Sequence, residues 1–356
     1  MKNKVKYALS IVGIIIASLI LLYMVCAFIV SKVLLDQMFG RADCDYELTT
    51  DFTDEDIENL RPDIKRFAIE FDSNGNTLHG NIWGDADKEK LVIISHGIGG
   101  HANGYYNEMM YFVDDGYRVL TYDCTGTCTS DGKGTTGLSQ SATDLHNALL
   151  FVESNTELKD LPVYLFGHSW GGHAVATVLN YEHKNIKAVA SVAGYNSNGG
   201  IMLEWMKGSM GMGGFSYLVF PFAAICSYAE AGTTYNYTAV GGINGSDIPV
   251  LAVQGDCDDI VWQDSIYNHR DEITNDKFEF KLIEGGTHNG VLSSDDSEIL
   301  KYRENIINEY KTIREKYNDN IPREVDVEFF SKIEKDKFNG INEDTMTAIK
   351  NFFDKA

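Results

Sequence analysis

The segment Y-L-F-G-H-S-W-G-G-H, residues 164–173, joins an apolar run to a histidine, a serine and three glycines. It contains the pattern G-x-S-x-G, formed by Gly167, Ser169 and Gly171, which in a strand–turn–helix context presents a serine hydroxyl at the end of a strand. Gly172 adds room at the start of the helix that would follow. The simpler alternative is a strand that runs into a glycine-rich turn, and the pattern alone does not distinguish the two.

The sequence around this segment predicts a doubly wound α/β sheet. Short apolar runs that each end in Gly or Asp occur at residues 91–97, 117–123, 161–167, 186–194, 248–256 and 278–286. Such runs are typical of strands buried on both faces of a parallel sheet, and helix-like segments lie between them. Residues 65–84 predict an antiparallel hairpin at the edge. We therefore expect a mostly parallel sheet whose functional loops lie at the carboxyl ends of its strands.

The composition indicates a folded, acidic protein. The 356 residues are 44% hydrophobic, which is ample for a sizeable core, and the net charge is −22. Five basic residues and one acidic residue in 1–41 leave a net charge of −26 for residues 42–356. Because such a surface repels polyanions, nucleic acid is excluded as a partner.

The N-terminus predicts a membrane anchor. Residues 7–30 are almost wholly apolar and uncharged, and these 24 residues exceed the length of about 20 that spans a bilayer. A cleaved signal peptide would have a shorter apolar region, of about 7 to 15 residues. Lys2, Lys4 and Lys6 precede the span, so the positive-inside rule predicts a cytoplasmic segment 1–6 and a body outside the cell membrane. The opposite orientation, with the body in the cytoplasm, is the alternative.

The remaining chain divides into four predicted parts. Residues 7–31 are the transmembrane anchor, 32–64 an acidic stalk, 65–315 the α/β domain and 316–356 a C-terminal helical extension. Residues 195–247, rich in Met, aromatics and Gly, are too long for an ordinary connection and predict a cap over the sheet. The alternative for this insertion is two core helices without substrate contact. The apolar spacing between Leu300 and Tyr317 predicts a helix packed on the sheet edge. The final segment is predicted to form a docking helix.

A serine nucleophile needs an imidazole that takes its proton and a carboxylate that orients the imidazole. Both residue types follow later strands of the predicted sheet. G-D-C-D-D-I-V, residues 255–261, supplies Asp256, Asp258 and Asp259, and G-G-T-H-N-G, residues 285–290, supplies His288. The chain order Ser, Asp, His is therefore present.

These motifs resemble those of the α/β-hydrolase family over most of residues 65–315. G-H-S-W-G-G matches the nucleophile turn at Ser169, and the resemblance implies that Asp258, rather than Asp256 or Asp259, is the acid and that His288 is the catalytic histidine. Y-D-C-T-G-T-C-T-S-D-G, residues 122–132, resembles a further family loop but has Cys where Gly is usual. The other histidines near these loops are interpreted as packing residues: His96, His101, His168 and His173. The side chain of His168 is expected to point away from the serine.

The loop H-G-I-G-G, residues 96–100, resembles the oxyanion loop of the same family. Gly97 and Gly99 would let the backbone approach a substrate, and the resemblance implies that the backbone N–H groups of Ile98 and Trp170 bind the oxyanion. Taken alone, the pattern also fits a tight turn or a phosphate-binding loop. A phosphate loop would favour a nearby Lys or Arg, and residues 96–110 contain none.

The predicted function is that of a serine hydrolase that cleaves carboxylic esters of lipid-like or other apolar acyl groups. The alternatives are an acylaminoacyl-type peptidase or amidase, and a membrane-tethered binding protein on an inactive hydrolase fold. No cofactor and no metal are expected, because the pair Cys124 and Cys128 has no matching pair at zinc spacing. The oligomeric state stays open. Five cysteines lie outside the span, so at least one is unpaired or pairs between chains.

Overall fold

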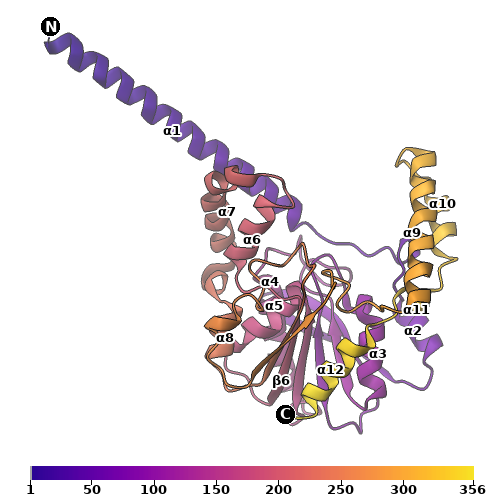
Figure 1. The fold of residues 1–356 in the computed structure, drawn as a ribbon. Helices are drawn as coiled ribbons and strands as arrows, with labels where there is room; N and C mark the ends of the chain where they lie inside the picture. Colours follow the sequence, from indigo (N-terminus) through magenta and orange to yellow (C-terminus); the bar gives the residue numbers. More distant parts are fainter. Residues whose placement is uncertain (1) are drawn as a thin grey trace.

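A single eight-stranded sheet forms the centre of the computed structural model, which describes residues 2–356 (Figure 1). Its strand order is β1-β2-β4-β3-β5-β6-β7-β8. The β1–β2 and β2–β4 pairs are antiparallel and all others are parallel, which confirms the predicted sheet with its antiparallel start. The strands are β1 Arg66–Ser73, β2 Asn76–Trp83, β3 Leu91–Ser95, β4 Arg118–Tyr122, β5 Val163–His168, β6 Ile186–Val192, β7 Val250–Gly255 and β8 Phe278–Ile283.

The central strands are apolar on both sides because both faces of the sheet are covered. Leu91 and Ile93 of β3 belong to one apolar cluster, while Val92 and Ile94 belong to the other, as the alternation of side chains along a strand requires. The β1–β2 hairpin turns at Asn74 and Gly75, which both have positive φ, at 54° and 88°. This matches the twist that two-residue hairpin turns favour.

Helices cover the two faces in separate layers. The first face carries α4 (Gln140–Ser154), α5 (Trp170–Thr177) and α8 (Ala239–Asn244). The second face carries α3 (Tyr106–Asp114) and α12 (Glu343–Phe353). Short 3-10 segments complete the connections: η1 Tyr46–Leu48, η2 Ala102–Tyr105, η3 Val178–Asn180, η4 Gly213–Phe215, η5 Gly232–Asn236 and η6 Arg270–Glu272.

The predicted cap forms two helices above the first face. α6 (Asn198–Lys207) and α7 (Ser216–Ala231) follow β6 and lie between the sheet and α1 (Figure 1). The prediction of residues 195–247 as one cap differs from the structure at its end, because α8 packs on α5 and belongs to the helical layer of the body.

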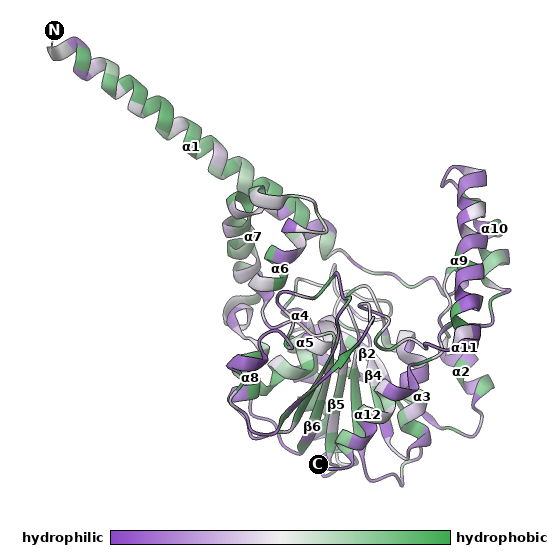
Figure 2. Cartoon of the chain, viewed as in Figure 1, coloured by the Kyte–Doolittle hydropathy of each residue, from purple (hydrophilic) through white to green (hydrophobic). Residues whose placement is uncertain are grey.

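The N-terminal helix α1 (Lys2–Met38) continues beyond the predicted anchor at 7–31. Ala27, Ser31 and Leu35 are buried, and their four-residue spacing places them on one face of the helix. Because α1 lies beside α7, this face packs on the cap. The helix is apolar along most of its length (Figure 2). Residues 4–38 have a mean hydropathy of 2.8 in their most apolar part, and the helix is long enough to cross a membrane.

The segment predicted as a stalk, residues 32–64, lies along the body instead of forming a spacer. After α1 it contains η1 and α2 (Asp54–Leu60). Phe39, Phe52 and Ile57 are buried, and a disulfide joins Cys44 to Cys128 in the loop after β4. Several of its apolar residues are therefore part of the core, although the segment is acidic overall.

The C-terminal region also differs from its predicted division at 315/316. α9 (Ser297–Tyr317) has no buried residue and stands with α10 (Arg323–Phe330) as an arm away from the sheet (Figure 1). A short helix α11 (Lys335–Phe338) leads back to the body, where α12 buries Ile349 and Phe353 against the sheet. The final helix is therefore part of the scaffold, and the helix expected to pack on the sheet edge is exposed.

Candidate active site

Ser169 occupies the sharp turn between β5 and α5. Its backbone has φ 58° and ψ −114°, a conformation that non-glycine residues rarely adopt. The Ser169 N–H donates to the carbonyl of Val192 in the neighbouring strand at 2.8 Å, which fixes the turn against the sheet. A backbone held in this strained conformation at the end of a central strand is what a nucleophile turn requires.

The glycines of the motif are required by close backbone contacts. A Cβ at Gly171 would lie 1.8 Å from the carbonyl oxygen of Ser95, and a Cβ at Gly167 would lie 2.2 Å from that of Gly171. A Cβ at Gly172 would lie 2.6 Å from the carbonyl oxygen of Val192. The three glycines therefore let α5 start directly against β3 and β6.

The structure brings Ser169, His288 and Asp258 together in one hydrogen-bonded line. The Ser169 hydroxyl lies 2.8 Å from His288 Nε2, and His288 Nδ1 lies 2.8 Å from Asp258 Oδ2. All three residues are nearly buried, with exposed fractions of 7%, 6% and 3%. The arrangement has the geometry of a nucleophile, a base and an orienting carboxylate.

Asp258 is held by donors on several sides. Its Oδ1 accepts from the N–H groups of Ile260 and Val261 at 2.9 and 2.8 Å, and its Oδ2 accepts from Gln254 Nε2 at 2.8 Å. Burial pushes the pKa of Asp258 upward, but the hydrogen bonds from His288 and from the two amides outweigh it, so the pKa lies below that of an ordinary aspartate. The carboxylate is therefore ionised at neutral pH.

The neighbouring aspartates of the same loop have other positions. Asp256 and Asp259 are exposed, and Asp256 accepts a hydrogen bond from the N–H of Gly285 at 2.7 Å, where it joins the loops after β7 and β8. Neither is hydrogen-bonded to His288 in the part of the chain that the structure describes.

The loop 96–100 lies beside the serine. A Cβ at Gly97 would be 3.5 Å from the Ser169 Cβ, and Gly99 has φ 71°, a conformation that favours glycine. Within residues 2–356, no hydrogen bond is donated by the backbone N–H of Ile98 or Trp170. Both amides are therefore free to bind an oxyanion.

His168 has partners other than the serine hydroxyl and connects two loops of the site. The Gly97 N–H donates to the Tyr105 hydroxyl at 3.1 Å, and this hydroxyl lies 2.9 Å from His168 Nδ1. His168 Nε2 lies 3.1 Å from the carbonyl oxygen of His288. Burial, together with the nearby His288, lowers the pKa of His168 to about 4, so it is neutral near pH 7. Tyr105 was missed by the sequence analysis, as was Gln254, because only the folded structure brings them to the site.

The other predicted packing histidines are hydrogen-bonded to the backbone or, in the case of His101, to the predicted stalk segment 32–64. His96 lies 2.8 Å from the Gly97 carbonyl through Nδ1 and accepts from the Cys124 amide through Nε2, and His173 lies 3.0 Å from the Tyr195 carbonyl.

His101 lies next to the disulfide that joins the segment 32–64 to the loop after β4. One His101 nitrogen and the sulfurs of Cys44 and Cys128 lie within 4.8 Å of one another. Since the two sulfurs are joined in a disulfide, they are not available as thiolate ligands, and His101 instead bonds to Asp51 at 2.9 Å.

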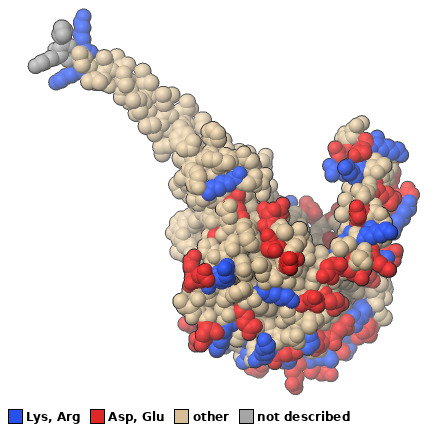
Figure 3. All heavy atoms as spheres, in the orientation of Figure 1, with Lys and Arg blue, Asp and Glu red and all other residues tan. Residues whose placement is uncertain are grey.

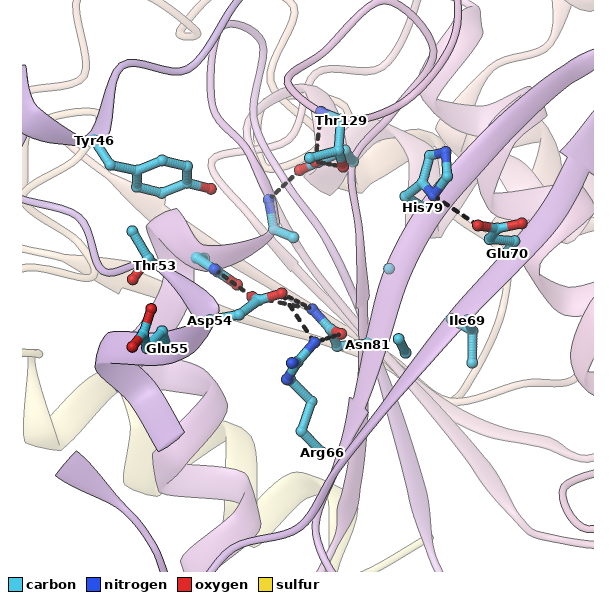
Figure 4. Close-up of a pocket in the computed structure, with 15 residues that line it drawn as sticks. Tyr46, Thr53, Asp54, Glu55, Arg66, Ile69, Glu70, His79, Asn81 and Thr129 are labelled. Carbon is cyan, nitrogen blue, oxygen red and sulfur yellow. Dashed lines mark hydrogen bonds and ion pairs between the residues drawn. The ribbon is translucent and has the colours of Figure 1, made fainter. Parts of the chain in front are cut away.

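A separate cavity lies between α2, the β1–β2 hairpin and the segment 102–103 (Figure 4). Its volume is about 730 Å³, and none of the three residues of the serine–histidine–aspartate line borders it. Asp54 accepts hydrogen bonds there from Arg66, Asn81 and Asn103. The polar groups of this cavity are largely paired with one another, which indicates a structural role in holding α2 on the hairpin.

Comparison with known proteins agrees with this fold. A model of the family described as serine aminopeptidase, S33, matches residues 86–212. A 2-hydroxy-6-oxononadienedioate/2-hydroxy-6-oxononatrienedioate hydrolase of Klebsiella pneumoniae is 34% identical over 125 residues, which are 34% of this chain and 42% of that protein. The same-named enzyme of Escherichia coli is 36% identical over 121 residues, which are 32% of this chain and 40% of that one. The chain thus spans less than half the length of the curated relatives it matches.

Among solved structures, an esterase from Pyrococcus furiosus has a TM-score of 0.53 at 20% identity over 70% of this chain and 90% of the esterase. A second crystal form of that esterase gives a TM-score of 0.51 over 70% of this chain and 89% of the esterase. The fold is that of the α/β hydrolases, and the matched relatives are hydrolases, which agrees with the predicted class.

Proposed function

Because this chain has the fold of the α/β hydrolases, we propose that it is a serine hydrolase that cleaves carboxylic esters through an acyl-enzyme on Ser169. The observation that carries the proposal is the pair of 2.8 Å contacts that join Ser169 Oγ to His288 and His288 to Asp258. Two further observations support a serine hydrolase: the free amides of Ile98 and Trp170, and the neutral state of His168.

In the first step, His288 Nε2 takes the proton of the Ser169 hydroxyl while Oγ attacks the carbonyl carbon. The imidazolium that forms is stabilised by the ionised Asp258, whose lowered pKa keeps it charged. His288 then gives this proton to the leaving alcohol, and the acyl group stays on Ser169. A water molecule, activated by the same imidazole, releases the acid and restores the serine.

The negative charge on the tetrahedral oxygen needs donors that are already in place. We assign this role to the N–H groups of Ile98 and Trp170, and the assignment is supported by the absence of another acceptor for either group among residues 2–356. Each such donor contributes about 3 kcal/mol to the stabilisation of a transition state in comparable sites.

The substrate class is proposed from the composition of the cap. Residues 195–247 are rich in Met and aromatic residues, which favours an apolar acyl group over a charged one. The family model is described as serine aminopeptidase, so cleavage of an aminoacyl amide is the second candidate.

The location of the enzyme is proposed to be the cell membrane, with α1 as the anchor and the body outside. The three lysines before the apolar run support a cytoplasmic N-terminus. The disulfide between Cys44 and Cys128 supports an oxidising compartment for the body. Protease treatment of intact cells would remove the body in this orientation and leave it untouched in the opposite one.

The proposed function is tested by labelling the full chain with a fluorophosphonate probe. The wild type and a Ser154→Ala control, changed on the exposed end of α4, should be labelled, whereas Ser169→Ala should not. Equal labelling of Ser169→Ala would overturn the assignment of the nucleophile, and an unlabelled wild type would favour a non-catalytic binding protein. Turnover of p-nitrophenyl esters of increasing chain length, compared with aminoacyl anilides, then separates ester from amide substrates.

A further inference from the structure

The cap carries an exposed apolar face. Phe215, at the end of η4, is 74% exposed, and Tyr217 and Leu218 of α7 are 59% and 51% exposed. Positions 217, 218, 221, 225 and 228 fall within about 100° of one another around α7, at 100° per residue. All five are exposed. We call these five residues and Phe215 the cap face.

None of the six residues of the cap face is charged, and the ammonium group of Lys207 lies 4.4 Å from the centre of the Tyr217 ring at its margin. Residues 208–229 contain no Asp, Glu, Lys or Arg, although 23% of the chain is charged. In Figure 3 the upper cap and α1 are almost uniformly uncharged, whereas acidic and basic side chains cover the visible face of the body. An uncharged, aromatic-containing surface of this kind marks an interaction site.

The position of the cap face along α1 indicates what covers it. Tyr23 already contacts α7, and the buried side of α1 begins at Ala27. The 20 residues from Tyr7 to Cys26 extend about 30 Å at 1.5 Å per residue, which is the thickness of the hydrocarbon core of a bilayer. The body therefore starts within the last turn of such a span.

The start of α7 lies at this same level. The Tyr23 hydroxyl donates to the Leu218 carbonyl, and the Tyr23 ring lies 5.8 Å from the ring of Phe222. Leu218 and Phe222 of α7 thus lie beside the turn of α1 that contains Tyr23, and the cap face is turned outward. Aromatic side chains at this level are typical of the membrane–water interface.

We propose that the cap face docks into the outer boundary of the membrane that α1 crosses, so that η4 and the exposed side of α7 lie among the lipid headgroups and upper acyl chains. The proposal rests on the proposed anchoring by α1. Docking is apolar: residues 42–356 carry a net charge of −26, and an anionic surface would repel them. The face should therefore bind neutral phosphatidylcholine, with little dependence on salt.

The experiment uses the full chain in nanodiscs of phosphatidylcholine, with one chain per disc. The exposed Cys26 and Cys257 are replaced by Ser, and a single environment-sensitive fluorophore is placed at Leu218→Cys, at Ile15→Cys in the middle of α1, or at Ile307→Cys. Ile307 on α9 is 60% exposed, which makes it a matched exposed apolar site away from the cap. Quenching by nitroxide lipids and by aqueous iodide is measured for each.

The expected result is strong lipid quenching at 15 and 218, with iodide quenching at least several-fold weaker at 218 than at 307. The docking of the cap face would be overturned if iodide quenched the fluorophore at position 218 as strongly as the one at position 307, while the fluorophore at position 15 was still quenched by nitroxide lipids. Loss of lipid quenching at 15 would overturn the anchor itself. Protection of 218 that appears only with two chains per disc would overturn the proposal in favour of a second copy as the occupant.

Paired substitutions give a second measurement. With the fluorophore at Phe215→Cys, the changes Leu218→Asp and Ile225→Asp together should reduce lipid quenching several-fold, while Ile307→Asp leaves it unchanged. Both variants should keep fluorophosphonate labelling of Ser169, so a failure of the docking proposal is distinguishable from a failure of the proposed function. Lipid quenching that does not change in the paired variant would contradict the proposal.

Discussion

The imidazole of His168 holds the backbone carbonyl of His288, with Nε2 of the first residue 3.1 Å from the oxygen of the second. Tyr105 connects this contact to Gly97 in the loop 96–100. One hydrogen-bonded chain therefore joins the loop of the proposed base to the loop that carries Ile98, one of the two proposed oxyanion donors. Its direction requires a neutral His168, in agreement with the pKa of about 4.

Replacement of Tyr105 by Phe should slow ester turnover while the fold is kept. The hydroxyl accepts from Gly97 and donates to His168, so its loss loosens both loops, and we expect kcat to fall about 10-fold, a loss of about 1.4 kcal/mol, with a smaller change in KM. Tyr111→Phe, whose hydroxyl faces Thr347 at the surface, is the control. A kcat equal to that of the wild type would show that the chain does not position the site.

The choice between the aspartates of the loop after β7 can be tested by two substitutions. Asp258→Asn should reduce kcat by about 10⁴-fold, because the amide no longer holds the imidazole in the right tautomer. Asp256→Asn should leave kcat within a few-fold of the wild type, since Asp256 is exposed and its carboxylate accepts from the N–H of Gly285 instead of from His288. The reverse pattern in steady-state kinetics would move the role of the acid to Asp256.

The buried His173 should make stability depend on pH. Burial lowers its pKa to about 4, whereas in the unfolded chain it is about 6.5. As the pH falls from 7 to 5, the unfolded state takes up the proton first, so this residue destabilises the fold by roughly 2 kcal/mol at pH 5. Urea denaturation of the wild type and His173→Asn at both pH values gives this difference, and a gap between the two proteins that is independent of pH would contradict the lowered pKa.

The disulfide between Cys44 and Cys128 should contribute measurably to stability. It closes a loop with a sequence separation of 84 residues, for which the chain-entropy model gives about 4.6 kcal/mol. Replacement of both cysteines by Ser should lower the unfolding free energy by an amount of this order, whereas Cys257→Ser, at an exposed free cysteine, should not change it. If thiol labelling of the unfolded wild type finds six free cysteines, the bond does not form.

The sheet and the order of the proposed catalytic residues could be predicted from local sequence. Strands buried on both faces are short apolar runs, and each motif lies at the end of such a run, so local sequence placed Ser169, His288 and the three aspartates of residues 255–261 at strand ends. The choice of Asp258 among these aspartates came from the resemblance to the α/β hydrolases. Their hydrogen bonds follow from the fold, because strand ends of a parallel sheet meet at one edge.

The parts that were not predicted depend on contacts between distant segments. Leu300 and Ile307 have helical spacing but are exposed on α9, because Ile349 and Phe353 of α12 occupy the sheet face instead. Spacing shows that a helix has an apolar side, but not which of two helices the sheet will bind. Phe52 likewise lies in an acidic segment, and only the folded structure shows its burial.

The place of α12 has a consequence for the order in which the protein folds during synthesis. The second face of the sheet receives its last covering helix only when residues 343–353 have left the ribosome, and Phe353 is made 70 residues after Ile283, the last residue of β8. Until then the apolar side chains that Phe353 contacts, among them Tyr164 and Phe112, lack this cover. The nascent protein therefore passes through a stage with a complete set of strands and a second face that is covered by α3 but not yet by α12.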